Sequence, residues 1–341
     1  MIDVYSPKEL WQKLADPSLA EALAVVSGTN YVVVDARHET HWPMAHDEHF
    51  QPNCPVLGLC EARPALRRPA HHPAATWVDV FITEAEMAGL TAKIDASPEA
   101  ATVLTQVLRA GETASIAHAL HIESLAYSTL QHSNQFRAWR RYRLSVALAE
   151  EASNNAEPDA APLVLIERDG NTLHLTLNRP AHHNAYNSAM RDELCQALTL
   201  ALVDDNIDQL HWYGTGPSFC AGGDLREFGL AQDAGQAHIT RQTRSAALLL
   251  TRLANRVHTH LHGNCIGAGI ELPAFGKTIS AHPDTQFRLP EVAFGLIPGA
   301  GGTVSMPRRI GRHRTAKIAI TGDTVSVEEA RSWGLINRIQ D

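Results

Sequence analysis

The sequence predicts an α/β protein that has one large core and an additional region. Its 341 residues are more than twice the roughly 150 residues typical of one domain. Hydrophobic residues make up 44% and charged residues 19%, the balance of a globular chain that can bury a sizeable core. Strand-like runs alternate with segments of helical periodicity, and no Gly-x-Gly-x-x-Gly segment opens a helix. A layered α/β fold other than a dinucleotide-binding one is therefore expected.

Charge and cysteine usage narrow the class of protein. The net charge of −8 argues against a nucleic-acid binder that relies on a positive field. No apolar run approaches the roughly 18 residues needed to cross a bilayer, and the first residues lack the features of a signal peptide. Five cysteines without CxxC spacing fit neither a disulfide framework nor a zinc site. We expect a cytoplasmic protein with reduced thiols and with neither a nucleic-acid nor a membrane partner.

The first region, residues 1–148, is predicted to begin as α/β and to end as helices. Ser6 and Glu9 form a capping-box pattern, which predicts a helix from Ser6 to about Val25. Further helices are expected to begin at Thr83 and Ser97, where the same kinds of capping residue occur. The remaining expected elements are strands at 31–35, 55–60 and 77–83 and helices at about 115–130 and 134–147.

A linker at residues 149–162 and a core at residues 163–341 are predicted next. The linker is acidic and small-residue-rich, with two prolines and no large apolar residue. In the core, Asp169-Gly170 suits a hairpin turn between strands at 163–168 and 172–177. Asn187 or Ser188 can cap a helix, and helical spacing of apolar residues runs from Ile239 to Val257. Further strands are expected at 209–213 and near 261–265 and 277–281.

Two glycine-rich segments follow strand-like runs, at residues 220–224 and 267–271. Small residues at such turns let a ligand approach backbone N–H groups, and two converging donors can stabilise negative charge on a carbonyl oxygen. Either segment by itself is more typical of a tight turn required for packing. A third glycine cluster at 298–303 can open a helix whose positive end faces a ligand.

Glu271 and Glu291 stand out because each has apolar sequence neighbours. A carboxyl group buried among such neighbours has a raised pKa, which suits proton transfer near neutral pH. The alternative for each glutamate is a surface carboxylate or a helix cap.

Five motifs, in this order and spacing, resemble the enoyl-CoA hydratase/isomerase (crotonase) superfamily from about Leu163 to Ile339. They are Asn178-Arg179-Pro180 with Asn184-Ala185, then 219–225, Gly267 to Glu271, Leu289-Pro290-Glu291 and 297–303. The resemblance implies a spiral of ββα units. It also implies an oxyanion hole made by the N–H groups of Gly223 and Ala268, and catalysis by Glu271 and Glu291.

The resemblance further implies the binding residues and partners. An acyl-CoA thioester is the expected substrate, no metal or further cofactor is required, and a homotrimer or hexamer is the expected assembly. Arginines beside aromatic residues in 136–143 suit the CoA phosphates and adenine, although a solvated basic helix face gives the same pattern. The expected substrate contacts are Ala221, Asp224, Leu225, Gly267, Pro298 and Gly299, with His182, Arg226, Phe136 and Arg140 as candidate contacts to CoA.

The chain departs from the superfamily pattern at its end. It stops at Asp341, where the resemblance implies further helices that close the acyl pocket and contact neighbouring subunits. Residues 78–143 resemble that missing piece. We therefore hypothesise a permuted arrangement in which the N-terminal half supplies these helices as an additional helical region. Helices remote from Glu271 and Glu291 in every subunit would refute this idea.

The leading prediction is hydration of a trans-2-enoyl-CoA. Double-bond isomerisation or other enolate chemistry is the alternative within enzymes, since the same groups can move a proton without adding water. A CoA-thioester-binding subunit without turnover is the alternative of another class, although paired buried carboxylates argue against it. Histidines at 38–49 and 258–262 have spacings that a metal site could use, but a polar loop and one face of a strand are the preferred interpretations.

Overall fold

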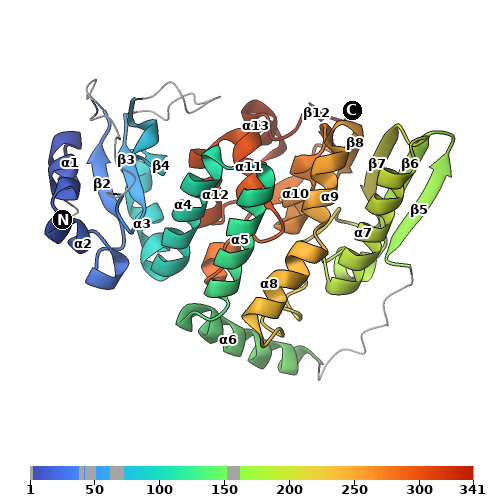
Figure 1. The fold of residues 1–341 in the computed structure, drawn as a ribbon, viewed down its shortest axis with the longest axis horizontal. Helices are drawn as coiled ribbons and strands as arrows, with labels where there is room; N and C mark the ends of the chain where they lie inside the picture. The colour runs from blue at the N-terminus through green and yellow to red at the C-terminus, as the bar shows by residue number, and fades with distance from the viewer. Residues whose placement is uncertain (1–2, 38–41, 43–50, 62–72, 152–161, 341) are drawn as a thin grey trace.

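The computed structural model describes residues 3–37, 42, 51–61, 73–151 and 162–340. Within these residues the chain forms a four-stranded, a six-stranded and a two-stranded sheet. The four-stranded sheet lies at one end of the molecule and the six-stranded sheet at the other, with helices from both halves of the chain between them (Figure 1). The predicted α/β class with an additional N-terminal helical region is confirmed. Most of the predicted linker, 152–161, lies outside the described residues.

The N-terminal sheet is parallel throughout and has the order β1-β2-β3-β4. The predicted helix from Ser6 to Val25 is wrong, because α1 ends at Ala15. Asp16 is extended there and accepts a hydrogen bond from the Ser18 N–H, which caps a second helix. The elements of this part are β1 (Val4–Tyr5), α1 (Pro7–Ala15), α2 (Pro17–Ala22), β2 (Val32–Asp35), β3 (Val56–Leu59), β4 (Val80–Ile82) and α3 (Glu84–Ala96).

Three long helices follow, α4 (Pro98–Thr113), α5 (Ile116–Leu130) and α6 (Asn134–Glu151). Their starts agree with the prediction, although α6 continues into the expected linker. Helices α4 and α5 pack against helices of the C-terminal half, with α5 contacting α8 (Ala234–Thr243) and α11 (Gly302–Ile310) (Figure 1). Segments separated by more than 100 residues therefore form one helical layer.

The six-stranded sheet has the order β12-β10-β8-β7-β6-β5, and only β5 runs antiparallel to its neighbour. The predicted hairpin turns at Gly170, whose φ of 55° suits glycine. Helices α7 (Ser188–Val203) and α9 (Ala246–Leu253) pack against each other, and α7 contacts β5 and β6. The strands are β5 (Val164–Asp169), β6 (Thr172–Leu177), β7 (Gln209–Gly214), β8 (Val257–Leu261), β10 (Thr278–Ala281) and β12 (Arg338–Ile339).

The helical pattern from Ile239 to Val257 does not form one helix. Helix α8 ends before Arg244, Ser245 caps α9 by accepting from the Leu248 N–H, and Val257 begins β8. The expected strand at 261–265 is correspondingly divided between β8 and β9 (Asn264–Ile266), which pairs with β11 (Gln286–Arg288). Tertiary packing of the β-branched Val257 and a side-chain cap outweigh the continuous periodicity here.

His258 and His260 lie on one face of β8 and alternate with buried residues, as expected. The histidines at 38–49 lie outside the described residues. In the part of the chain that the structure describes, no group of His, Cys, Asp or Glu could hold a metal ion. No helix in that part combines the length and apolarity needed to cross a bilayer.

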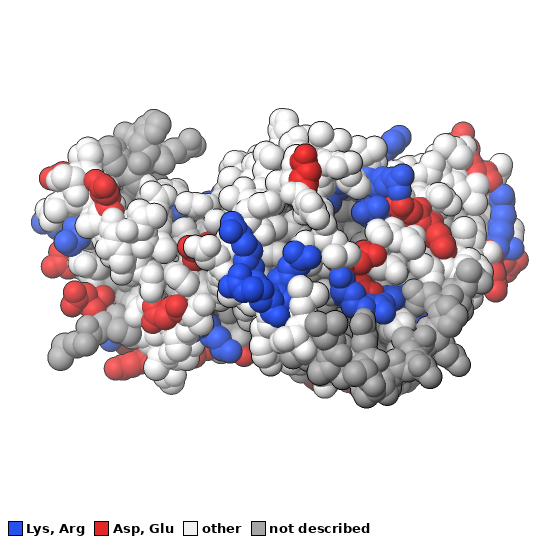
Figure 2. Space-filling view, turned by 90° about the horizontal axis from the view of Figure 1, so that it is seen from below, with Lys and Arg blue, Asp and Glu red and all other residues white. Residues whose placement is uncertain are grey.

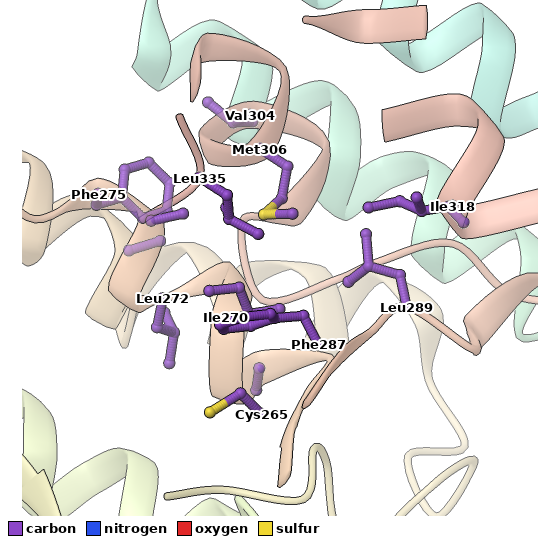
Figure 3. Packing of buried hydrophobic residues seen from close by; sticks show 14 of the residues in the cluster. Cys265, Ile270, Leu272, Phe275, Phe287, Leu289, Val304, Met306, Ile318 and Leu335 are labelled. Atoms are coloured by element: carbon purple, nitrogen blue, oxygen red, sulfur yellow. The ribbon is translucent and has the colours of Figure 1, made fainter. Parts of the chain in front are cut away.

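The two halves meet around α10 (Ala268–Glu271), α11 and α12 (Arg312–Thr321). Figure 3 shows Ile270, Met306 and Leu289 among the apolar side chains buried there. Arg312 adds a buried polar connection, since its guanidinium donates to the Val78 and Ala75 carbonyls and pairs with Glu112 at 2.9 Å and Asp79 at 3.3 Å. Helix α13 (Val327–Trp333) follows α12 and precedes β12.

Candidate active site

A cavity of about 270 Å³ lies where α5, α8, α10 and the segment before α11 approach one another. Its wall contains side chains from both halves of the chain, among them Glu123, Tyr127, Arg241, Glu271 and Glu291. The predicted oxyanion donors Gly223 and Ala268 also line the cavity. Of the expected contact residues, Asp224 and Gly299 line it as well. The cavity therefore brings together the residues that the glycine-rich segments and the two glutamates indicated.

Glu271 and Glu291 face the same point. Glu271 ends α10, whereas Glu291 begins a 3₁₀ turn, Glu291–Phe294, just after β11. Their exposed fractions are 2% and 8%. A Cβ atom built on Gly267 would lie 2.5 Å from Oε1 of Glu291 and 3.5 Å from Oε1 of Glu271. Gly267 also has a φ of 49°, so glycine is required there both for conformation and for space.

The two carboxyl groups differ in their hydrogen bonds. Oε2 of Glu271 accepts from the N–H groups of Ala300 at 2.7 Å and Gly302 at 2.8 Å. Oε2 of Glu291 is buried and has no hydrogen-bond partner among the described residues. N–H donors stabilise an ionised carboxylate, whereas an apolar, unpartnered setting favours the protonated acid. The hydrogen bonds thus favour the ionised form at Glu271 more than at Glu291.

Burial dominates the electrostatics of this pair. Desolvation, reinforced by repulsion from Glu291 and Glu123, raises the pKa of Glu271 well above its usual value. Desolvation also raises the pKa of Glu291, to about 8. Carboxyl groups with such pKa values can both accept and donate protons near neutral pH.

A third buried carboxylate, Glu123 of α5, was not among the site residues predicted from the sequence. Its Oε1 accepts from the Gly301 N–H at 2.8 Å, and its Oε2 accepts from the Thr303 N–H at 2.9 Å and Oγ1 at 2.7 Å. Desolvation raises the pKa of Glu123 to about 7 despite these bonds. The available signal was a glutamate on the apolar stripe of a helix, next to buried Leu120.

The start of α11 therefore binds two carboxylates at once. The N–H groups of Ala300 and Gly302 bond to Glu271, while those of Gly301 and Thr303 bond to Glu123. The first N–H groups of a helix have no partner within the helix, and the helix dipole favours negative charge at this end. The predicted helix start in the third glycine cluster is confirmed, and it serves side chains of the protein.

Gly223 and Ala268 are brought together by close backbone contact. Cys220 and Cys265 form a parallel β-bridge, and the Ile266 N–H donates to the Cys220 carbonyl at 3.0 Å. The N–H groups of Gly223 and Ala268 donate no hydrogen bond to any other described residue, and both residues line the cavity. Two such free donors on one wall can bind an oxyanion.

The other predicted contacts have mixed placements. The Asp224 carboxylate is occupied by Arg179 at 2.8 Å and Arg226 at 2.7 Å. Hydrogen bonds from Arg226 and then Arg179 outweigh desolvation and lower the pKa of Asp224 to about 2. The Gly299 backbone lies against the Tyr127 ring. The remaining four, Ala221, Leu225, Gly267 and Pro298, are not in the cavity wall but adjoin lining residues or lie two residues from one.

The candidate CoA contacts lie outside the cavity wall. His182 is half-buried in a 3₁₀ turn, and Arg226 is exposed. Phe136 is 1% exposed and stacks on Trp139 at 5.6 Å, so its ring is part of the packed interior. Arg140 of the same helix is half-buried beside Gly229. Figure 2 views the molecule from the side on which α6 runs in Figure 1 and shows basic side chains gathered in the central part of this face.

Comparison with known proteins identifies the family of this chain. The enoyl-CoA hydratase/isomerase family model matches residues 167–340. The chain belongs to this family. It is 31% identical over 176 residues to a 2,3-dehydroadipyl-CoA hydratase of Escherichia coli. The aligned residues cover 52% of this chain and 68% of that protein. It is 33% identical over 183 residues to a 1,2-epoxyphenylacetyl-CoA isomerase of the same organism, and the alignment covers 52% of this chain and 70% of that protein.

A crystal structure of an enoyl-CoA hydratase from Mycobacterium smegmatis is also similar, at 31% identity and a TM-score of 0.48, covering 52% of this chain and 70% of that one. Membership of the family makes this chain an acyl-CoA enzyme of the hydratase or isomerase type. The matched region begins at residue 167, so α4 to α6 lie outside it. Helix α5 nevertheless contributes Glu123 and Tyr127 to the cavity wall.

Proposed function

We propose that this enzyme hydrates a trans-2-enoyl-CoA to a 3-hydroxyacyl-CoA by syn addition of water. The observation that carries the proposal is the convergence of Glu271 and Glu291 on one point beside two free N–H donors. The thioester oxygen accepts hydrogen bonds from Gly223 and Ala268, which stabilise the negative charge that develops on it. No metal or further cofactor takes part in these steps.

Each carboxyl group has a separate task in the proposed reaction. Glu271, held ionised by the Ala300 and Gly302 N–H groups, accepts a proton from water as the water oxygen bonds to Cβ. The C=C electron pair moves into the thioester enolate held in the oxyanion hole. Glu291 then gives its proton to Cα, and exchange with water restores both groups. The raised pKa of Glu291 keeps a proton on it for this step near neutral pH.

The substrate's CoA portion is proposed to run past the segment 220–224 toward the basic side chains near it. His182, Arg226 and Arg140 remain the proposed contacts, since arginine suits phosphate. The buried Phe136 is proposed to support Arg140 through the packing of α6. Cytoplasmic location and a homotrimeric or hexameric assembly stay part of the proposal.

The test measures the conjugated enoyl absorbance of crotonyl-CoA and trans-2-hexenoyl-CoA with the wild type and the variants Glu271→Gln and Glu291→Gln. We expect the wild type to remove the enoyl absorbance. The rate of each variant should be lower than the wild-type rate by a factor of about 100 or more, the usual range for general acid-base groups. Glu227→Gln is the matched control, because Glu227 lines the same cavity but bonds to Ser188.

Wild-type activity in both variants would contradict the assignment. A product that retains a double bond would identify isomerisation, which needs the same proton transfers without addition of water. Binding of saturated acyl-CoA without turnover of any enoyl substrate would favour the non-catalytic subunit.

A further inference from the structure

Arg241 is a cation in the cavity wall that the proposed reaction does not use. It lies in the last turn of α8 and reaches across to α5. Its Nε donates to Ser124 Oγ at 3.1 Å, and its Nη2 donates to the Ser124 carbonyl at 3.2 Å and to Ser128 Oγ. The guanidinium lies 5.1 Å from the centre of the Tyr127 ring. These contacts fix the side chain in one place at the cavity.

No described carboxylate forms an ion pair with Arg241, and its Nη1 donates no hydrogen bond to a described residue. Neighbouring Arg191 and Arg244 differ, since both pair with Asp192. The oxygens of Glu123 are already bonded to the start of α11. Burial lowers the pKa of Arg241, and the attraction of Glu123, which shares its charge with the start of α11, offsets this only in part. A partly buried cation with unused donors is costly unless an anion joins it.

Tyr127 connects Arg241 to the reaction centre. Its ring lies against Gly299, which precedes the Ala300 bonded to Glu271, and under the guanidinium of Arg241. All of these residues line the same cavity as Gly223 and Ala268. An acyl group with its carbonyl at the two N–H donors and its Cα and Cβ at the glutamates can therefore extend along Tyr127 toward Arg241.

We propose that the cavity selects acyl groups that carry a carboxylate at the end far from the thioester, and that Arg241 binds this carboxylate through its Nη1 side. A neutral alkyl chain would leave the Nη1 donors unused, whereas a carboxylate would give them a charge-assisted hydrogen bond. This inference rests on the proposed function, because it requires an acyl thioester in the cavity.

The test is calorimetric titration of the full chain with adipoyl-CoA and hexanoyl-CoA, which have six acyl carbons and no double bond to hydrate. We expect adipoyl-CoA to bind about tenfold more tightly or better, the range for one charge-assisted hydrogen bond. Arg241→Gln should remove this preference and leave hexanoyl-CoA affinity within about twofold, whereas Arg241→Lys should keep part of it. Arg244→Gln is the matched control, because Arg244 already pairs with Asp192.

Equal affinity of the wild type for the two thioesters would overturn the inference and leave the proposed function standing. Equal weakening of both ligands by Arg241→Gln would also overturn it, since this would make Arg241 only a connection between α8 and α5. Failure of both thioesters to bind would remove the proposed function and this inference together. The wild-type comparison needs no variant, so a poorly folded variant does not weaken the test.

Discussion

The substitution Glu123→Gln tests how far the N-terminal half takes part in the chemistry. Glu123 accepts three hydrogen bonds with two oxygens, from Gly301 and from the N–H and hydroxyl of Thr303. Glutamine has one acceptor oxygen, so its amide group must face an N–H donor on one side. At least one charge-assisted bond is lost, which costs about 1.5–3 kcal/mol.

This loss falls on the segment that holds Glu271. The N–H groups of Ala300 and Gly302 alternate along the chain with those bonded to Glu123. If the whole cost appears in the transition state, kcat falls about 10- to 150-fold. KM should change little, because the hydrogen bonds of Glu123 go to Gly301 and Thr303 and not to the substrate.

The pH profile gives a second, independent readout. A charged Glu123 raises the pKa of both Glu271 and Glu291 by repulsion. Removing this charge lowers both pKa values. The bell-shaped profile of kcat/KM should therefore move to lower pH on both its acidic and its basic limb.

The assay follows enoyl-CoA absorbance from pH 5.5 to 9.5 for the wild type, Glu123→Gln and Thr303→Val. The valine variant removes one hydrogen bond and keeps the carboxylate, so it should lower kcat without the same shift of the profile. A Glu123→Gln enzyme with an unchanged profile and wild-type kcat would refute the reasoning. Equal shifts in both variants would also refute it, because the charge would then have no separate effect.

Three further predictions concern stability and packing. Burial raises the pKa of Glu291 to about 8 from 4.5, so the folded state keeps a proton that the unfolded state releases. The stability of the wild type therefore falls as the pH rises between these two values. In urea titrations, Glu291→Gln should be more stable than the wild type by about 4 kcal/mol at pH 8, with much less gain at pH 5. In the same titrations, Arg312→Ala should lower the free energy of unfolding by about 3–5 kcal/mol. Arg168→Ala, which breaks a partly exposed pair, should lower it by less than about 1 kcal/mol. Equal losses of stability would contradict the buried network. In Gly302→Ala the new Cβ would lie 2.7 Å from Oε2 of Glu271, so kcat should fall about tenfold or more, whereas Gly89→Ala has open space and should keep full activity.

The residues that the sequence identified share a local signal. Glu271 lies beside a glycine that permits an unusual turn, and Glu291 follows a short strand, so each could be recognised within its own segment. Strands β5, β6 and β7 were predicted for the same reason, since alternation of apolar and polar residues is a local property.

The errors arise where contacts distant in the sequence decide the outcome. Apolar residues continue at helical spacing from Ile239 to Val257, but Ser245 caps a new helix and Val257 is buried in the sheet. Glu123 and Arg241 become part of one cavity only because α5 packs on α8 and α11. The apolar stripe of α5 indicates that Glu123 is buried, but nothing in either segment indicates that Glu123 and Arg241 share a cavity.

The same packing explains how the fold tolerates three buried carboxyl groups. Burial raises the pKa of each, so each weakens the folded state as the pH rises above its unfolded value. The free N–H groups at the start of α11 compensate two of them, Glu271 from the C-terminal half and Glu123 from the N-terminal half. No such N–H groups compensate Glu291, whose Oε2 is buried without a hydrogen-bond partner among the described residues. The uncompensated group is thus the one whose proposed task is to hold a proton and release it to the substrate, which is the behaviour that an unpartnered, desolvated acid has.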